Sequence, residues 1–259
     1  MTTAALERRI PAAGGFNTTA LSIEIKRLLR NRRTVIFTVV MPIVLYLMIG
    51  TNSSYVNERA GNGNVSAYIM ISMAVYGAIL ATTGGGAMVA TERAQGWTRQ
   101  LRLTPLSPFA YVAIKSITAL LLGAGSIIAV NVAGIVSGKP DMPVHVWIEA
   151  AVIAWLGSIV FGAFGLFMGY LLPSENVMQI LGPLMAGLAA LGGLWFPIDS
   201  DSLMGHISAV TPVHGLAELA RWPLNGGTPS FWWFVNVVGW FAVFALGAAW
   251  RMSKDTQRV

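Results

Sequence analysis

The chain has 259 residues, of which 55% are hydrophobic and only 11% are charged, and its mean hydropathy is +0.64. Because a soluble domain normally carries about 25% charged residues, this composition excludes an ordinary soluble enzyme or binding module. The formal net charge is +6, but the charges are bunched between long apolar runs. We therefore attribute the basic balance to membrane topology and not to nucleic-acid binding. The chain has no cysteine, which excludes disulfides and thiolate metal sites.

Six stretches without Asp, Glu, Lys or Arg divide the chain, and each is at least 23 residues long. A membrane-spanning helix needs roughly 20 apolar residues, and these runs are too long for the strands of a soluble protein. We expect an all-α integral membrane protein with six transmembrane helices in one domain, residues 34–250. The predicted spans lie at about residues 34–51, 66–90, 109–137, 147–172, 177–197 and 231–250.

Residues 1–33 precede the first span as a loose tail followed by an amphipathic helix. Within residues 17–33, one face carries Leu21, Ile25, Leu28 and Leu29, and the basic residues lie elsewhere. This pattern is typical of a helix that lies in the membrane interface. The alternative is that the segment is only the positively charged flank of the first span.

The distribution of Lys and Arg predicts the orientation in the membrane. With six spans, fourteen of the seventeen Lys and Arg residues fall on the side of the termini, and Arg59, Lys139 and Arg221 fall on the other. The positive-inside rule then makes both termini cytoplasmic, including the short C-terminal tail, 251–259. The excess of Arg over Lys and the many Ala and Gly residues are typical of proteins from GC-rich bacteria. We therefore expect a multi-pass protein of a bacterial cytoplasmic (inner) membrane.

A short charged segment, TERAQGWTRQLRLTPLS, separates the second and third spans. We expect a cytoplasmic amphipathic helix over residues 91–103, with Thr91 as its N-cap and the following prolines as its end. A helical wheel places Trp97 and Leu101 toward the bundle and Glu92, Arg99 and Arg102 on the opposite, exposed side. Such a face is suited to docking a soluble partner. The alternative is that these charges merely keep a loop soluble.

The stretch between the fifth and sixth spans is too polar to cross a membrane but has a helical pattern. Thr211 followed by Pro212 is typical of a helix start, with proline at the first helical position. We expect two short helices here, packed on the outer mouth of the bundle or dipping into it.

The segment ERAQGWTRQLRLTPLSPFAYVAIK resembles the connection between the second and third spans of ABC exporter type-2 permeases. The matching positions are Glu92, Arg93, Gly96, Leu101, Thr104, Pro105, Leu106, Ser107 and Lys115. The general plan is also similar, with a basic N-terminal helix, six spans, GGLWFP closing the fifth span and helical outer segments before the sixth. The resemblance is to the drug-resistance and antibiotic-export branch of that family.

This resemblance implies the membrane-spanning subunit of an ATP-driven exporter. Two permease subunits, identical or paralogous, would form the pathway, and two copies of a separate ABC ATPase would bind the 91–103 segment as a coupling helix. The chain has no G-x-x-x-x-G-K-[ST] phosphate loop. We therefore expect no catalytic site and no cofactor in this chain, with ATP and magnesium held by the partner ATPase.

The resemblance assigns candidate residues for coupling to the ATPase: Glu92, Arg93, Gly96, Arg99 and Arg102. Trp97 and Leu101 would pack the coupling helix onto the bundle. The family role does not exclude the alternative that Glu92 and Arg93 only solubilise the loop.

Small residues recur at helical spacing on the fifth span, at Gly182, Ala186, Ala189 and Gly193. Such a stripe lets helices approach closely, which fits a dimer interface or pathway wall but fits packing within one subunit equally well. On the fourth span we expect the similar stripe of Gly162, Gly165 and Gly169 to pack within the subunit.

An apolar pathway without ionisable residues suits a hydrophobic or amphipathic cargo, such as a drug, an antibiotic or a lipid-like molecule. Export of a polysaccharide or a lipid-linked glycan is the alternative within the same family. An ion-coupled carrier is less favoured because such carriers place ionisable residues inside their spans. A membrane-embedded transferase is also less favoured because it needs a base, a nucleophile or metal ligands, and the three histidines lack metal-ligand spacing.

Overall fold

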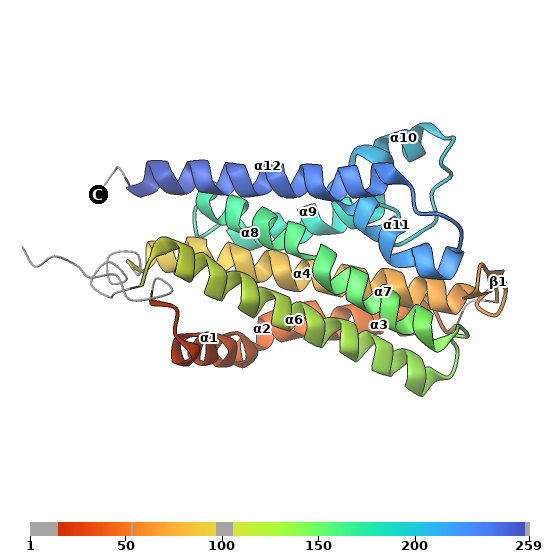
Figure 1. Ribbon diagram of the computed structural model, residues 1–259. Helices are drawn as coiled ribbons and strands as arrows, with labels where there is room; N and C mark the ends of the chain where they lie inside the picture. The colour runs from red at the N-terminus through yellow and green to blue at the C-terminus, as the bar shows by residue number, and fades with distance from the viewer. Residues whose placement is uncertain (1–14, 53, 97–105, 257–259) are drawn as a thin grey trace, which may run out of the picture.

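The computed structural model of the protein describes residues 15–52, 54–96 and 106–256. Its long helices run roughly side by side (Figure 1). The elements in chain order are α1 (Thr18–Arg30), α2 (Arg32–Val35), the π-helical turn η2 (Ile36–Val40), α3 (Met41–Ile49), β1 (Arg59–Ala60), β2 (Gly63–Asn64), α4 (Val65–Ala94), α6 (Pro108–Ser137), α7 (Val144–Gly157), α8 (Ile159–Leu171), α9 (Val177–Leu191), α10 (Leu203–Val210), α11 (Pro212–Asn225) and α12 (Phe231–Thr256).

The two ends of this bundle differ. α1 and the C-terminal end of α12 lie at one end, which we call the α1 end (Figure 1). α10 lies at the opposite end, the α10 end, together with a small antiparallel hairpin in which Arg59 pairs with Asn64. This hairpin occupies the short connection between the first two predicted spans.

Four helices within the described ranges are long and apolar enough to cross a membrane: Val65–Ala94, Ala110–Ser137, Val144–Leu171 and Phe231–Lys254. The expected all-α membrane protein is therefore confirmed. The remaining two predicted spans correspond to shorter apolar helices, Ile36–Ile49 and Val177–Leu191. The 15 residues of α9 extend only about 22 Å, against a hydrocarbon core of about 30 Å. Six complete spans therefore stay a prediction.

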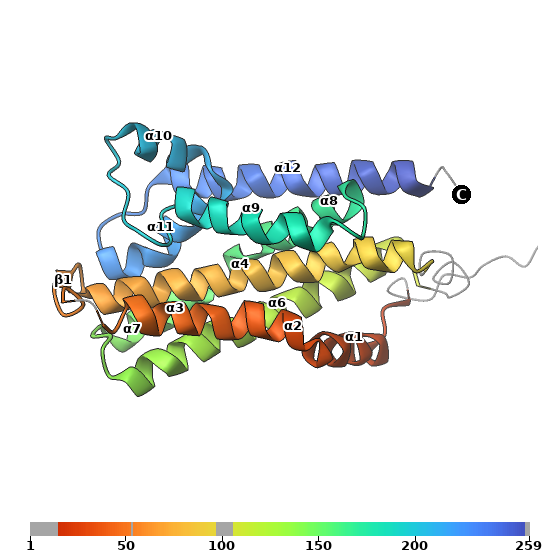
Figure 2. The same cartoon turned by 180° about the vertical axis from the view of Figure 1, so that it is seen from behind.

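α4 forms the centre of the bundle and is mostly buried along its length. α6 and α8 pack closely against it, and Figure 2 shows α3 and α9 on its other side. A Cβ added at Gly165 would lie 2.1 Å from the Thr83 carbonyl oxygen, and one at Gly86 would lie 2.5 Å from that of Gly162. Only glycine allows backbones to approach so closely. The prediction that the glycines of the fourth span pack within the subunit is thus confirmed.

Pro42 lies at the start of α3, directly after the π-helical turn. Because proline has no backbone N–H, the carbonyl of Thr38, four residues earlier, lacks its helical donor. Ser126 of α6 supplies the replacement, since its hydroxyl donates to the Thr38 carbonyl oxygen at 2.5 Å. This bond satisfies the buried carbonyl and fastens the first apolar helix to α6.

Two helices, α10 and α11, form between the fifth and sixth predicted spans, as expected. Thr211 has extended backbone and Pro212 is the first residue of α11, which confirms the predicted helix start. The Thr211 hydroxyl does not cap α11, however, because it donates to the Ser208 carbonyl oxygen at 2.8 Å. α11 packs against α7, α12 and α4, so most of its residues are buried.

The prediction that a new helix begins with Thr91 as its N-cap is wrong. α4 continues without a break through Thr91 to Ala94, and Gln95 closes it with a backbone hydrogen bond to the Thr91 carbonyl. Gly96 follows with φ of 76°, a left-handed conformation that commonly ends helices. The reason is that a change from apolar to charged side chains does not interrupt backbone hydrogen bonds. Residues 97–103 of the predicted coupling helix lie outside the described residues.

Candidate functional site

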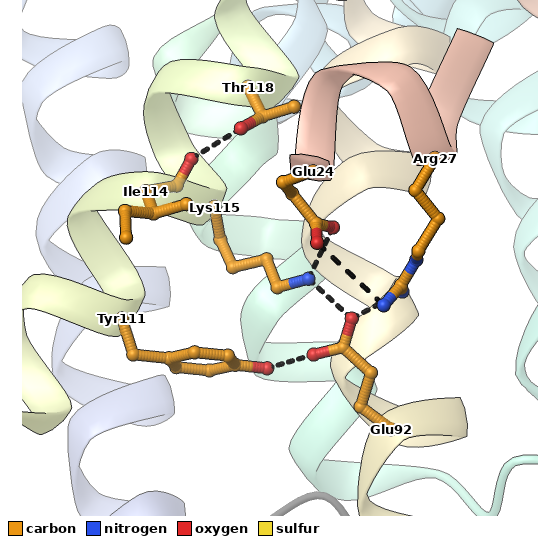
Figure 3. Close-up of polar contacts among 7 residues, drawn as sticks. All are labelled: Glu24, Arg27, Glu92, Tyr111, Ile114, Lys115 and Thr118. Carbon is orange, nitrogen blue, oxygen red and sulfur yellow. Dashed lines mark hydrogen bonds and ion pairs between the residues drawn. The ribbon is translucent and has the colours of Figure 1, made fainter. Parts of the chain in front are cut away.

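Four charged side chains and one tyrosine meet at the α1 end, and we call them the Glu92 cluster (Figure 3). The carboxylate of Glu92 accepts hydrogen bonds from Lys115, Arg27 and Tyr111. Glu24 completes the cluster, with its carboxylate oxygens 2.5 Å from Nζ of Lys115 and 3.7 Å from the Arg27 guanidinium. Glu92 and Lys115 are only 3% and 4% exposed. Two carboxylates thus face two cations, and such pairing is what makes buried charges tolerable.

Three helices supply the Glu92 cluster. α1 contributes Glu24 and Arg27, which lie three residues apart on one face of the helix, and the last turn of α4 contributes Glu92. The first turns of α6 contribute Tyr111 and Lys115, four residues apart, with Nζ of the lysine 5.5 Å from the tyrosine ring centroid. The cluster therefore ties α1 to both ends of the connection between α4 and α6.

The exposed position predicted for Glu92 is wrong, because the side chain is buried in this cluster. The prediction assumed a separate amphipathic helix with its charged side toward the cytoplasm. Since α4 continues through this residue, the packing of α4 against α1 and α6 decides which way Glu92 faces.

Arg93 extends the contacts at this end to a further helix. Its Nη1 donates to the carbonyl oxygens of Gly169 and Tyr170 at 3.2 and 3.3 Å, and its guanidinium lies 5.3 Å from the Tyr170 ring centroid. These carbonyls belong to the last turn of α8, where helical carbonyls lack internal partners and the helix dipole is negative. Arg93 thereby caps the C-terminal end of α8.

The remaining residues expected to couple or pack the segment are Trp97, Arg99, Leu101 and Arg102, and they lie outside the described residues. On the N-terminal side of the segment stand Glu92 and Arg93, both bound to other helices, and on its C-terminal side stands Lys115.

Comparison with known proteins identifies the family. The model of the family described as "ABC-2 type transporter" matches residues 17–225, from the residue before α1 to the last residue of α11. The chain belongs to this family. It is also 26% identical over 229 residues to a Bacillus subtilis (strain 168) protein named "Putative transport permease YvfS", which covers 86% of this chain and 91% of the relative.

As an ABC-2 type membrane permease, the chain is a non-catalytic, multi-pass subunit of a transporter. Permeases of this family pair with ABC ATPase subunits. The match includes both α1 and the α4–α6 connection, so the Glu92 cluster lies entirely within the part of the chain that defines the family.

The small residues of the fifth span do not form the single stripe that the sequence predicts. The permease's α9 ends at Leu191, so Gly193 lies beyond the helix, buried within the subunit with φ of 73°. Ala189 is fully buried and Ala186 half-buried, whereas Gly182 is exposed with open space around it. The prediction of a single stripe fails because it assumed that the helix continues through Gly193. An interface role stays a prediction for Gly182 and Ala186.

Sequence reasoning missed Glu24 and Tyr111. For Glu24 a signal exists, because it lies three residues after Leu21 and four before Leu28, on the apolar face of the N-terminal helix. Acidic side chains are rarely buried without a partner, so this position predicts a cation opposite it. Tyr111 gives no comparable signal, since aromatic residues are common near the ends of spans.

Proposed function

We propose that this permease exports a hydrophobic or amphipathic molecule across a bacterial cytoplasmic membrane, powered by a separate ABC ATPase that docks at the α1 end. The observation that carries the proposal is the buried Glu92 cluster, which joins α1, α4 and α6 where the ATPase would act. The concentration of Lys and Arg on this side supports a cytoplasmic location for it. ATP and magnesium would be bound by the ATPase.

The Glu92 cluster provides a route by which movement of the docking segment reaches the helices. Glu92 is bound to α1 and α6, and Arg93 is bound to α8. A displacement of residues 97–105 would therefore be transmitted to four helices, α1, α4, α6 and α8. Buried, fully paired polar networks favour one arrangement of their members, which suits transmission of a movement.

This mechanism divides the predicted coupling residues into two groups. Glu92 and Arg93 are positioning residues, because their side chains contact other helices of the permease. Arg99 and Arg102 remain the proposed contacts with the ATPase. Gly96 follows the end of α4 in a left-handed conformation that commonly ends helices, which is the role proposed for it here. In the same proposal Trp97 and Leu101 hold the segment against the permease.

A second permease subunit, identical or paralogous, would complete the pathway. The short helices α3 and α9 lie on the same side of α4 (Figure 2). Both expose large apolar side chains, including Val44 and Met48 of α3 and Ile180 of α9, and the surface at Gly182 is open. Small residues allow helices to approach closely. We propose that the second subunit packs here, so that protein covers the two helices that are short for spanning the membrane alone.

The proposed cargo follows from the spans and from the connecting motif. The six uncharged stretches leave the pathway without ionisable groups, which favours a hydrophobic or amphipathic molecule. The Glu92-to-Lys115 motif supports the drug-resistance and antibiotic-export branch of the family. Two copies of the ATPase, one for each permease subunit, are expected in the assembly.

The proposal is tested by purifying the permease in nanodiscs together with the ABC ATPase encoded beside it. We expect a complex of two permeases and two ATPases, with ATP hydrolysis that depends on both. Inside-out vesicles carrying the complex should accumulate a hydrophobic fluorescent dye when ATP is supplied. Failure of the ATPase to associate would contradict the proposal, and transport of a glycan in place of the dye would select the alternative cargo.

A further inference from the structure

A cavity of about 360 Å³ lies at the α10 end, far from the Glu92 cluster. Its wall is formed by α10, α11, the chain after α9, the start of α4 and the start of α12. A volume of a few hundred cubic ångströms is within the range of small-molecule sites, which are mostly apolar with a few placed polar groups. Tyr68, Pro197, Ile198 and Trp233 supply the apolar part of this wall.

Arg221 belongs to the polar part of the cavity wall and is only 1% exposed. Its Nε donates to the Ser72 hydroxyl at 3.0 Å, its Nη2 to the Gly193 carbonyl oxygen at 2.5 Å and its Nη1 to Oε1 of Glu218 at 3.1 Å. The guanidinium also lies 4.4 Å from the ring centroid of Tyr68. Each of its nitrogens thus has a protein partner, and the arginine holds Glu218 in place.

Glu218 keeps an acceptor available to the cavity. Its Oε1 binds Arg221, but its Oε2 makes no hydrogen bond within the described part of the chain, and the side chain is 24% exposed. A carboxylate oxygen accepts strongly from charged donors. Because Arg221 is only 1% exposed, the group of this ion pair that a ligand in the cavity can reach is the carboxylate acceptor.

The imidazoles of His206 and His214 lie on the cavity wall, and that of His206 adds a further acceptor. Nδ1 of His206 lies 2.8 Å from the Ser202 carbonyl oxygen, so this nitrogen carries the hydrogen and Nε2 is left as an acceptor in the neutral ring. His214 contacts the Ser208 hydroxyl at 3.1 Å through Nδ1. Burial lowers the pKa of His214, which favours its neutral form.

We propose that this cavity binds the ammonium end of an amphipathic amine, with Glu218 as the principal acceptor and the apolar part of the amine along Tyr68, Ile198 and Trp233. Aromatic faces also attract cations, so the two rings are suited to line the path of the charged group. The binding site is inferred from the cavity and its lining residues alone. Only the further statement that the amine is a cargo molecule, bound at the outer side of the membrane, rests on the proposed export function.

The test measures binding to the isolated permease in nanodiscs, without any ATPase. The probes are dansylcadaverine, which ends in an ammonium group, and 6-(dansylamino)hexanoate, which has a similar ring and tether but ends in a carboxylate. Their emission is followed by energy transfer from tryptophan, because Trp233 lies on the cavity wall. We expect the ammonium probe to bind saturably and the carboxylate probe to bind at least about tenfold more weakly.

Two variants locate the site. Glu218→Gln should weaken binding of the ammonium probe about tenfold, because it removes one charge-assisted hydrogen bond. Glu149→Gln is the matched control, since it removes an exposed carboxylate of α7 that does not line the cavity. Ala209→Phe fills the cavity and leaves the Glu218–Arg221 pair unaltered, so it should also weaken binding even if Glu218→Gln disturbs the fold.

Three outcomes would overturn the proposal: equal binding of both probes, tighter binding of the carboxylate probe, or affinity in Glu218→Gln and Ala209→Phe equal to that of Glu149→Gln. The first and third would mean that the dansyl group only enters the lipid. None of them would affect assembly with the ATPase or ATP-driven dye accumulation. Conversely, a permease that binds the ammonium probe but no ATPase would disprove the proposed function and keep the site.

Discussion

The two ends of the permease both bury charge, but they do so in different ways. At the α1 end, Glu92 and Lys115 are packed within a balanced set of ions contributed by three helices. At the α10 end, Arg221 is bound mainly by neutral groups and one carboxylate, beside a cavity of about 360 Å³. The charges at the α1 end join helices to one another. Those at the α10 end leave space for a ligand and an acceptor that can bind it.

This difference shows what buried charges achieve in an otherwise apolar bundle. Where every ion has an ionic partner, the cluster fixes helices to one another and suits the transmission of movement. Where an arginine orients a carboxylate at the edge of a cavity, the same kind of pair prepares a surface for binding. Five substitutions test this difference, and they are given in order of decreasing expected effect.

Arg221→Met should have the largest effect on stability. It leaves the Glu218 carboxylate and the Gly193 carbonyl without their buried donor, and breaking such a pair costs about 3–5 kcal/mol. We expect the free energy of unfolding in detergent to fall by about that amount. The control is Arg59→Met, which removes an exposed arginine at the same end and should change stability by less than about 0.5 kcal/mol. Similar stability of both variants would show that Arg221 does not hold the α10 end together.

Lys115→Met should destabilise the α1 end by about 3 kcal/mol, somewhat less than Arg221→Met because Arg27 still neutralises Glu92. The double variant with Glu92→Gln should lose less than the sum of the single variants, by about 1–2 kcal/mol, since the two residues interact directly. The measurement is a double-mutant cycle of unfolding free energies. Strict additivity would mean that the pair contributes no interaction energy.

Glu92→Gln also tests coupling. We expect the complex with the ATPase to form while ATP-driven dye accumulation falls about tenfold, because the amide keeps some hydrogen bonds but loses the charge that holds α1 and α6. Glu149→Gln serves again as the exposed carboxylate control. Normal transport by Glu92→Gln would reject the role of the cluster in coupling.

Arg93→Met should cost only about 1 kcal/mol of stability, the usual contribution of a cation at a helix C-terminus. Its effect should be confined to the link with α8, because Arg93 donates to the last carbonyls of that helix. Hydrogen exchange of the final turn of α8 should increase, while α1 stays as protected as before. Faster exchange in α1 would show that Arg93 and the Glu92 cluster form one unit.

The smallest expected effect is a dependence of stability on pH at the α10 end. Burial lowers the pKa of His214, with Glu218 opposing this shift and Arg221 adding to it. The unfolded chain therefore binds more protons than the folded one below about pH 6.5, so stability should decline as the pH falls through that range. His214→Gln should flatten this dependence in thermal unfolding curves, and His145→Gln, at an exposed position, should not.

Individual residues show where sequence reasoning succeeded and where it failed. The start of α11 at Pro212 and the packing glycines of α8 were predicted, because proline position and small-residue spacing act locally. The helix start at Thr91 was wrong, since the expected boundary came from side-chain polarity and the backbone continued through it. Arg221 entered the sequence reasoning only in the count of Lys and Arg that predicts orientation, and that reasoning did not predict that α11 packs against α4, α7 and α12 and buries this arginine.

Hydropathy and helical periodicity depend on neighbouring residues, so they predicted an all-α membrane protein and the approximate positions of its apolar helices. The sequence also carried the motif that resembles ABC exporter type-2 permeases. The burial of Glu92 between α1 and α6 and the position of Glu218 beside a cavity became evident only from the folded chain. The ion pairs of the Glu92 cluster join residues as far apart in the sequence as Glu24 and Lys115. Their formation depends on how the helices pack, which no local pattern specifies.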